Sequence, residues 1–220
     1  MKKIGKKRLI FGSVFIVAFI TWTILVITVD VQPLGQNVTD IGFATLNCWF
    51  HRLIGTNMLL YKITDLLGLV PLFVCIVFAV IGFCQLINRK SLFKVDADII
   101  ILGLYYAVMI FCYILFETIP INYRPILIDG VAEASYPSST TLLVITVMSA
   151  LAEQLLRRIK KGALSKVLAA VSIVFLILTV VGRLFSGVHW ITDIVGSLFL
   201  SMGLFCIYKG LVLICLNKTE

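Results

Sequence analysis

The stretch GRLFSGVHWITD, residues 182–193, places an arginine, a histidine and an aspartate at short, fixed spacings. His189 and Asp193 are four residues apart, so on a helix they lie on one face. A carboxylate that binds one imidazole nitrogen fixes the tautomer and leaves the other nitrogen able to attack or to transfer a proton. Arg183 precedes the pair and can bind phosphate oxygens through two parallel N–H groups. Taken alone, the His–Asp pair favours a helix-capping aspartate beside a buried histidine, and a phosphate site becomes the stronger interpretation only together with further polar stretches.

Two further polar stretches supply groups of the same kind. The stretch ETIPINYRP, residues 117–125, holds Arg124 next to a proline that restricts the chain. The stretch YPSSTT, residues 136–141, is expected to open a helix, and the free amides of a helix N-terminus bind anions. Each stretch alone also fits an ordinary role, as an interfacial arginine or a Ser/Thr helix cap. The residues that we expect to surround one phosphate group beside His189 are Arg124, Arg183, Ser138, Ser139 and Thr140.

The composition defines the class of protein that carries these residues. Hydrophobic residues make up 60% of the 220-residue chain, charged residues make up 14%, and the mean hydropathy is +1.08. A soluble domain of this size cannot bury so much apolar surface, so we expect an integral membrane protein that forms one domain, residues 1–220. The net charge of +8 does not indicate nucleic-acid binding, because the basic residues flank apolar runs. The six cysteines include no C-x-x-C pair, and we expect no metal site.

Six apolar segments predict an all-α bundle of six transmembrane helices. Several segments are shorter than the about 20 residues that span a bilayer, so the ends of these helices must include polar residues. Strands are not expected in the spans, because lipid cannot satisfy an open sheet edge. The predicted segments are Leu9–Val29, Leu66–Ile87, Ile99–Phe116, Ser138–Leu156, Val167–Gly182 and His189–Cys215.

The distribution of lysine and arginine predicts how the helices are oriented. Fifteen of the nineteen basic residues lie before the first segment, between segments two and three, between four and five, or near the end of the last. Such residues mark the cytoplasmic side, so we expect a bacterial cell-membrane protein with both termini in the cytoplasm. The 30–57 loop, the 117–137 loop and the 182–193 turn then share the external face, and the candidate site residues gather there.

The 30–57 loop contains a second kind of pattern. Its large apolar residues recur at helical spacing, which predicts an amphipathic helix that lies on the membrane surface. These residues are Phe43, Leu46, Trp49, Phe50 and Leu53.

The order and spacing of the three polar stretches resemble the motifs of the type-2 phosphatidic acid phosphatases, also called lipid phosphate phosphatases, of the vanadium haloperoxidase superfamily. The six-helix layout, with the first two motifs between helices three and four, is also similar, and the resemblance covers nearly the whole chain. The family motifs are K-x6-RP, PSGH and SR-x5-H-x3-D. The matching stretches of this chain are Glu117-x6-Arg124-Pro125, Pro137-Ser138-Ser139-Thr140 and Gly182-Arg183-x5-His189-x3-Asp193.

The resemblance implies a reaction and a role for each matching residue. His189 would attack phosphorus and form a phosphohistidine, and Asp193 would orient His189. Arg124 and Arg183 would hold the phosphate oxygens, together with the backbone near Ser138 and Ser139. No metal or other cofactor would be needed. The substrate would be a membrane lipid phosphate or diphosphate that enters the external face from the outer leaflet.

Two departures from the motifs affect this expectation. Glu117 stands where the family has a phosphate-binding lysine, and Thr140 stands where it has the histidine that protonates the leaving group. A general acid contributes roughly 10²–10⁴-fold to a rate. A lipid diphosphate, which expels a phosphate-like group, needs such an acid less than a monophosphate does. Alternatively, Glu117 or the other histidine, His51, supplies the proton.

A third alternative is that hydrolysis has been lost. The fold would then bind or transport a lipid phosphate, or act as a phosphotransferase that passes the group to an acceptor other than water. Lys62 and Asp65 also lie near the external end of the second segment. Lys62 would replace the missing lysine or pair with Glu117, or else it forms a local ion pair with Asp65.

Overall fold

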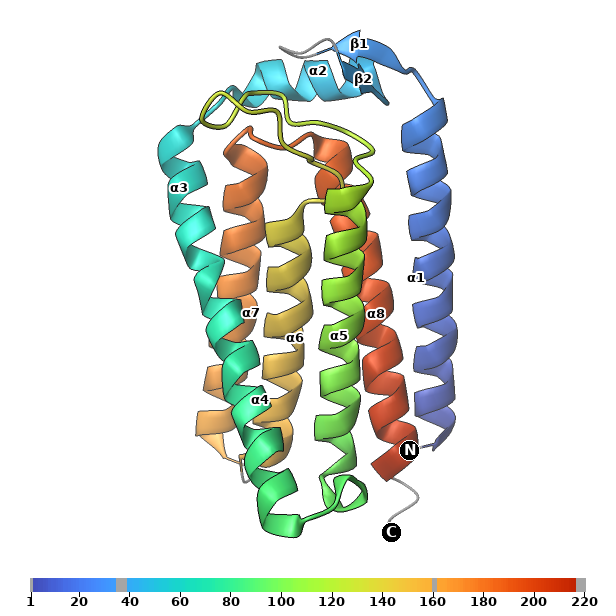
Figure 1. The fold of residues 1–220 in the computed structure, drawn as a ribbon, viewed down its shortest axis with the longest axis vertical. Helices are drawn as coiled ribbons and strands as arrows, with labels where there is room; N and C mark the ends of the chain where they lie inside the picture. The colour runs from blue at the N-terminus through green and yellow to red at the C-terminus, as the bar shows by residue number, and fades with distance from the viewer. Residues whose placement is uncertain (1, 35–38, 160–161, 217–220) are drawn as a thin grey trace.

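The computed structural model describes residues 2–34, 39–159 and 162–216, and these form a bundle of long, nearly parallel helices (Figure 1). Within the described residues, six spans are long and apolar enough to cross a membrane, which confirms the predicted all-α membrane architecture. The spanning elements are α1 (Lys2–Thr28), α3 (Met58–Leu67) together with α4 (Leu69–Arg89), α5 (Ala97–Thr118), α6 (Ser139–Arg158), α7 (Ala163–Phe185) and α8 (Ile191–Leu216).

The helices extend beyond the apolar segments from which they were predicted. The first span was expected at Leu9–Val29, whereas α1 runs from Lys2 to Thr28. Long lysine side chains reach water while their backbone continues the helix. Hydropathy alone therefore places the start of this helix too late in the sequence. The second span has a break at Gly68, between α3 and α4. Pro71 lies in the first turn of α4 and has no N–H group to donate, which interrupts the helical bonding there.

The end of the bundle opposite the termini is covered by short elements. β1 (Gln32–Leu34) and β2 (Thr39–Ile41) pair antiparallel, and α2 (Ala44–Ile54) follows them across the top of the bundle (Figure 1). The hairpin was not predicted, and it lies outside the spans, where water can satisfy its edges. On α2 the side chains of Trp49 and Leu53 are 60% and 68% exposed, as an interfacial helix requires.

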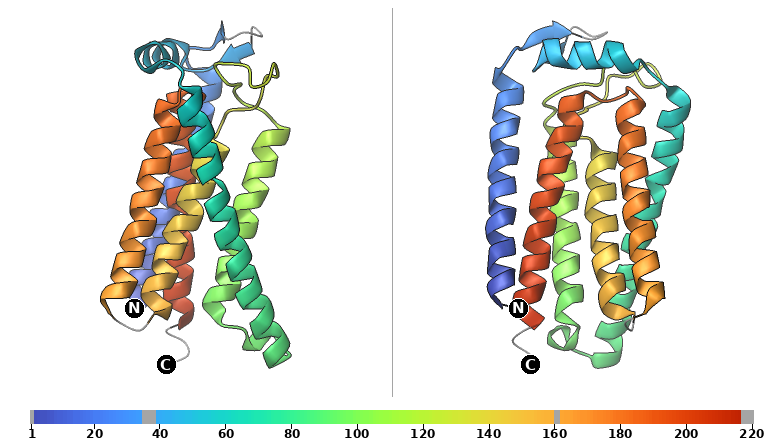
Figure 2. Two further views of the ribbon diagram at one scale, coloured as in Figure 1. Left: turned by 90° about the vertical axis from the view of Figure 1, so that its left-hand side faces the viewer. Right: turned by 180° about the vertical axis from the view of Figure 1, so that it is seen from behind.

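α6 and α8 form the centre of the bundle, and α1 packs along α8 (Figure 2, right). A side-chain carbon added at Gly12 of α1 would lie 3.0 Å from the backbone oxygen of Gly203 on α8, so the two backbones are in close contact. Tyr136 joins this packing to the 119–138 loop. Its hydroxyl bonds Thr23 of α1 at 2.8 Å, and its ring lies on Gly196 of α8.

The opposite end of the bundle, where both termini lie, is held by ion pairs. Arg158 of α6 binds both carboxylate oxygens of Asp98 on α5 at 2.9 Å and one oxygen of Asp96 at 3.3 Å. Arg89 of α4 binds Asp96 at 2.7 Å. Most of the basic residues assigned to the cytoplasm gather at this end, whereas Lys160, Lys161 and Lys218 lie outside the described residues.

The α3–α4 span and α5 move apart toward the end opposite the termini. α4 lies close to α5 where the chain passes through the short helix η1 (Leu92–Lys94), whereas α3 and the upper part of α5 are well separated (Figures 1 and 2). The ion pairs described above therefore close the bundle at one end, while the other end remains open between α3 and α5.

We predict that Arg158→Met lowers the melting temperature in detergent, because it leaves the buried Asp98 carboxylate without its partner. The expected loss is about 1–3 kcal/mol of unfolding free energy. Arg157→Met is the matched control, since Arg157 makes only a longer contact of 3.4 Å with Glu153 on its own helix. Equal melting temperatures for the two variants would contradict the assigned role of the Asp98–Arg158 pair.

Candidate active site

His189 lies in the short turn between α7 and α8. The backbone N–H of Trp190 donates to Asp193 Oδ2 at 2.9 Å, so Asp193 caps the first turn of α8 in the manner of a capping box. The same oxygen lies 3.5 Å from His189 Nδ1. The sequence left open whether Asp193 is a helix cap or a histidine partner, and the structure places one carboxylate where it serves both.

The two ring nitrogens of His189 have different surroundings. Nδ1 donates to the backbone carbonyl of Ser135 at 3.1 Å, which is a shorter contact than the one with Asp193. Nε2 is buried and has no hydrogen-bond partner among the described residues. Burial, and then the positive charges of Arg183 and Arg124, hold the pKa of His189 well below its usual value, although the Ser135 carbonyl opposes the shift. The ring is therefore neutral at pH 7, with the Nε2 lone pair available as a nucleophile.

Two buried guanidinium groups act on this histidine. The side chains of Arg124 and Arg183 are 8% and 1% exposed. On each of them, Nε and Nη1 are buried and have no hydrogen-bond partner within the described part of the chain. Neighbouring like charges repel, and buried N–H groups without acceptors carry a desolvation cost. A bound anion removes both penalties, so the pair of arginines is suited to bind phosphate.

Tyr61 of α3 contacts both arginines. The centroid of its ring lies 4.7 Å from Cζ of Arg183 and 5.7 Å from Cζ of Arg124. Contacts at these distances are attractive cation–π interactions, and they fix how the guanidinium groups lie relative to the ring. A helix that contributes none of the three sequence motifs therefore forms one wall of the site.

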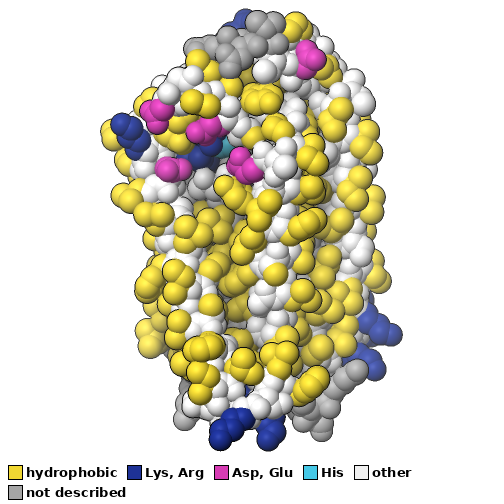
Figure 3. Space-filling view, viewed as in Figure 1, with side chains coloured by type: hydrophobic (Ala, Val, Ile, Leu, Met, Phe, Trp, Pro, Cys, Tyr) yellow, Lys and Arg dark blue, Asp and Glu magenta, His cyan; other side chains and the backbone are white. Residues whose placement is uncertain are grey.

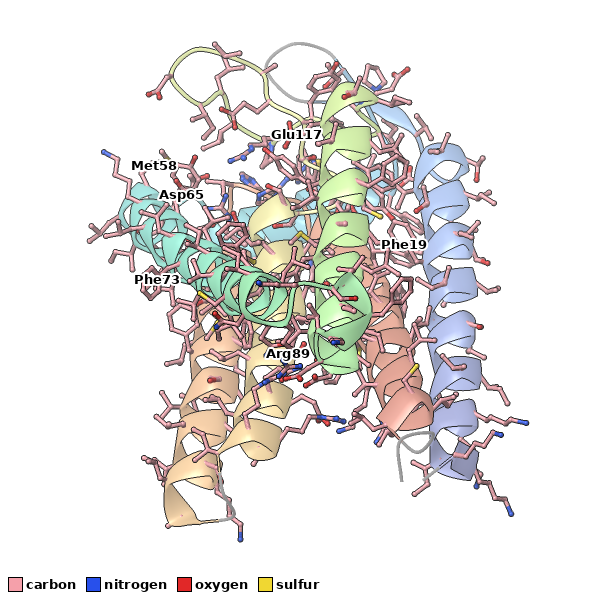
Figure 4. The ribbon with its side chains drawn as sticks, turned by 60° about the horizontal axis from the view of Figure 1, so that its bottom comes forward. Phe19, Met58, Asp65, Phe73, Arg89 and Glu117 are labelled. Carbon is pink, nitrogen blue, oxygen red and sulfur yellow. The ribbon has the colours of Figure 1, made fainter. Side chains whose placement is uncertain are left out.

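The arginines line an open pocket of about 650 Å³ at the end of the bundle opposite the termini. Figure 3 shows acidic side chains around a recessed basic side chain and a histidine in this region. In Figure 4, Asp65 on α3 and Glu117 on α5 lie on opposite sides of the pocket. The charged and hydroxyl residues that line it are Tyr61, Asp65, Tyr113, Glu117, Tyr123, Arg124, Glu133, Ser139, Thr140 and Arg183.

The predicted phosphate-binding residues at the start of α6 divide into two groups. Ser139 and Thr140 line the pocket, in the first turn of the helix. Ser138 is buried, and its donors are already used: its amide binds the Asp193 carbonyl at 3.3 Å and its hydroxyl binds Thr141 at 2.9 Å. Ser138 thus joins α6 to α8, and the helix N-terminus meets the pocket through Ser139 and Thr140.

The other sequence candidates are also placed by the structure. His51 Nε2 lies 3.1 Å from the Gly187 carbonyl, and its ring packs against Trp190, so His51 covers the turn that carries His189 and lines no part of the pocket. Glu117 lines the pocket. Asp65 lies 3.6 Å from Arg183, so the expected pairing of Asp65 with Lys62 is wrong. Among the described residues, no group of three His, Cys, Asp or Glu side chains could hold a metal ion.

Sequence reasoning missed Tyr61 and Glu133 as contributors to the site and did not link Asp65 to Arg183. Tyr61 and Asp65 are one helical turn apart on α3, and only Asp65 had been noted as unusual. Glu133 binds Arg124 Nη2 at 3.0 Å, and its backbone carbonyl accepts the Arg124 amide at 3.1 Å. The one available signal was the presence of acidic residues in an external loop, which by itself predicts no partner.

Comparison with known proteins agrees with this geometry. A model of the PAP2 superfamily matches residues 104–214, half of the chain, and this range contains all three motif stretches. The chain therefore belongs to the PAP2 superfamily, which confirms the resemblance seen in its motifs. No curated protein matches the chain by sequence.

A solved structure shares the fold. It is the crystal structure described as that of the first transmembrane PAP2-type phosphatidylglycerolphosphate phosphatase from Bacillus subtilis. The match has a TM-score of 0.62 and 16% sequence identity, and it covers 95% of this chain and 97% of the other. Similarity at this identity establishes the same six-helix membrane fold.

We predict that Tyr61→Leu weakens binding of inorganic phosphate by about fivefold, because both cation–π contacts are lost. Tyr61→Phe keeps the ring and is expected to bind almost as tightly as the wild type. Phosphate-induced thermal stabilisation in detergent measures both. Equal binding by the leucine and phenylalanine variants would show that the ring does not organise the arginines.

The lowered pKa of His189 predicts how stability depends on pH. As the pH falls below about 6.5, the unfolded chain takes up a proton at this histidine while the folded chain does not. The free energy of unfolding therefore decreases from about pH 6.5 downward, and His189→Gln loses this component. Parallel melting curves of wild type and His189→Gln between pH 7.5 and 5 would contradict the assignment.

Proposed function

We propose that this chain is an integral membrane phosphatase that removes a phosphate group from a membrane lipid phosphate or diphosphate. The observation that carries the proposal is the set of unpaired donors on Arg124 and Arg183 next to the unpaired Nε2 of a neutral His189. Arginine binds phosphate oxygens, and neutral imidazole is a suitable nucleophile. Membership of the PAP2 superfamily and a fold shared with a phosphatidylglycerolphosphate phosphatase support the proposal.

In the proposed reaction, His189 Nε2 attacks the phosphorus atom, a P–N bond forms, and the P–O bond to the lipid breaks. Arg124 and Arg183 stabilise the charge on the non-bridging oxygens. The imidazole becomes positively charged, and the Ser135 carbonyl and the Asp193 carboxylate next to Nδ1 stabilise that charge. Water then breaks the P–N bond, which releases phosphate and restores the neutral ring.

The residue at position 140 favours a diphosphate substrate. Thr140 lines the pocket where the family motif has an acid, and its hydroxyl is far too weakly acidic to protonate a leaving group at pH 7. A lipid diphosphate attacked at its terminal phosphorus expels a lipid monophosphate, which leaves as a stable anion. A lipid monophosphate must expel an alkoxide, which requires a proton. We therefore propose a preference for lipid diphosphates.

Access to the pocket is proposed to be from the outer leaflet. The pocket is lined by α3 on one side and α5 on the other, which diverge at this end (Figure 2). The termini and most basic residues lie at the other end, which the distribution of charge assigns to the cytoplasm. A lipid headgroup could thus enter between α3 and α5 while its chains remain in the bilayer.

Glu117 and Thr140 also favour a second candidate function. Both line the pocket, where Glu117 does not offer the cation of the first family motif and Thr140 does not offer the acid of the second. The phosphoryl group on His189 would then pass to an acceptor other than water, or the scaffold would bind or transport a lipid phosphate without cleaving it.

The first test is phosphate release by the purified protein in detergent from phosphatidic acid, phosphatidylglycerol phosphate and polyprenyl mono- and diphosphates. We expect release to be fastest with the diphosphate and to be absent in His189→Gln, because the amide cannot form the P–N bond. Retained phosphate-induced thermal stabilisation would show that this variant is folded. If neither protein releases phosphate, hydrolysis of these lipids is excluded. Addition of lipid acceptors would then test transfer of the phosphoryl group.

Thr140→His tests whether the missing acid sets the substrate preference. A histidine at this position is expected to raise the rate with a lipid monophosphate by about tenfold or more, because it can protonate the alkoxide. The rate with a diphosphate should change little. Thr140→Asn is the control of similar polarity without an acidic proton. An unchanged ratio of the two rates in Thr140→His would overturn the leaving-group explanation.

A further inference from the structure

In the empty protein, each of the two arginines already faces a carboxylate that belongs to none of the motifs. Glu133 Oε2 lies 3.0 Å from Arg124 Nη2, and Asp65 Oδ1 lies 3.6 Å from Arg183 Nη1. The carboxylates are at the mouth of the pocket, with side chains 41% and 59% exposed, whereas the arginines are buried. Each pair thus joins a buried cation to an anion that borders solvent.

Close backbone packing puts both carboxylates in place. The amide of Arg124 donates to the Glu133 carbonyl, so the two residues are neighbours across a short antiparallel pairing in the 119–138 loop. On the other side, a side-chain carbon added at Gly182 would lie 2.8 Å from Thr64 Cγ2. The absence of a side chain at Gly182 lets α3 approach α7, and this brings Asp65 to Arg183.

The carboxylates and a phosphate group compete for the same two cations. A guanidinium binds phosphate most strongly through two parallel N–H groups, and on Arg124 both such pairs include Nη2, the nitrogen that forms the ion pair with Glu133. Asp65 lies beyond hydrogen-bond distance, but it lowers the positive potential at Arg183. With Glu117, three carboxylates and two guanidinium groups line the pocket before any substrate arrives.

We propose that Asp65 and Glu133 are resident anions, which hold the arginines in the empty site and which a dianionic phosphate replaces on binding. Because of this exchange, an anion occupies the site only if it binds the arginines more strongly than the two carboxylates do. Phosphomonoesters and terminal diphosphates carry enough charge to replace the carboxylates, whereas the singly charged phosphodiesters of ordinary phospholipids bind too weakly to occupy the site. The inference rests on the proposed function only for the assumption that the ligand is a lipid phosphate.

The proposal predicts the direction of change of two quantities, the melting temperature and the affinity for phosphate. If the carboxylates are resident anions, Asp65→Asn and Glu133→Gln lower the melting temperature of the ligand-free protein and also tighten phosphate binding. If the carboxylates merely position the arginines, the same variants weaken phosphate binding. Asp129→Asn is the matched control, because Asp129 lies in the same loop, is exposed and lines no part of the pocket. It has a positive φ of 49°, which asparagine tolerates well.

The experiment uses the full chain in detergent at pH 8, where methyl phosphate is a dianion and dimethyl phosphate is a monoanion. Binding is measured by thermal stabilisation and by intrinsic tryptophan fluorescence, to which Trp190, next to His189, contributes. The Asp65→Asn/Glu133→Gln double variant should bind methyl phosphate about three- to tenfold more tightly than the wild type and should gain detectable binding of dimethyl phosphate. The control should match the wild type.

Unchanged or weaker methyl phosphate binding in the double variant would overturn the proposal, as would wild-type protein that binds the two probes equally well. Tighter binding in a variant that melts earlier cannot come from partial unfolding, which would only reduce binding. Phosphate release from lipid substrates is measured on the same preparations. Tighter binding without any release would leave this inference standing and would contradict the proposed phosphatase activity.

Discussion

Two guanidinium groups are buried next to each other at the edge of a membrane bundle, and much of the structure around the pocket follows from that constraint. Arg183 is almost completely buried, and Arg124 is nearly so. Their repulsion and desolvation must be offset by the protein or by a ligand. The ring of Tyr61 and the carboxylates of Glu133 and Asp65 supply part of the compensation. The unpaired N–H groups that remain define the space for an anion.

The two ends of the bundle are built for different purposes. At the end that holds the termini, Arg158 and Arg89 bind Asp96 and Asp98 and close the bundle. At the other end, α3 and α5 diverge around a polar pocket. Rigidity at one end and separation at the other let a headgroup reach buried cations without unfolding any helix.

Position 140 affects both the chemistry and the packing. Thr140 faces the pocket at the start of α6, and its methyl group lies 3.5 Å from where a side chain on Gly68 would begin. A small residue therefore stands where the junction of α3 and α4 meets α6. The wall that brings Tyr61 and Asp65 to the arginines is adjacent to the position where the family acid is missing.

The sequence by itself determined the membrane class, the six spans and the cluster of Arg124, Arg183 and His189, because hydropathy and motif spacing are local properties of the chain. Only the tertiary structure decided which partners these residues have. Ser135 rather than Asp193 makes the shorter contact with His189 Nδ1, and Ser138 joins two helices instead of facing the pocket. Tyr61 and Glu133 reach the arginines through the close packing of α3 on α7 and through a pairing within the 119–138 loop. Such contacts depend on which backbones approach each other, and no spacing along the sequence encodes that.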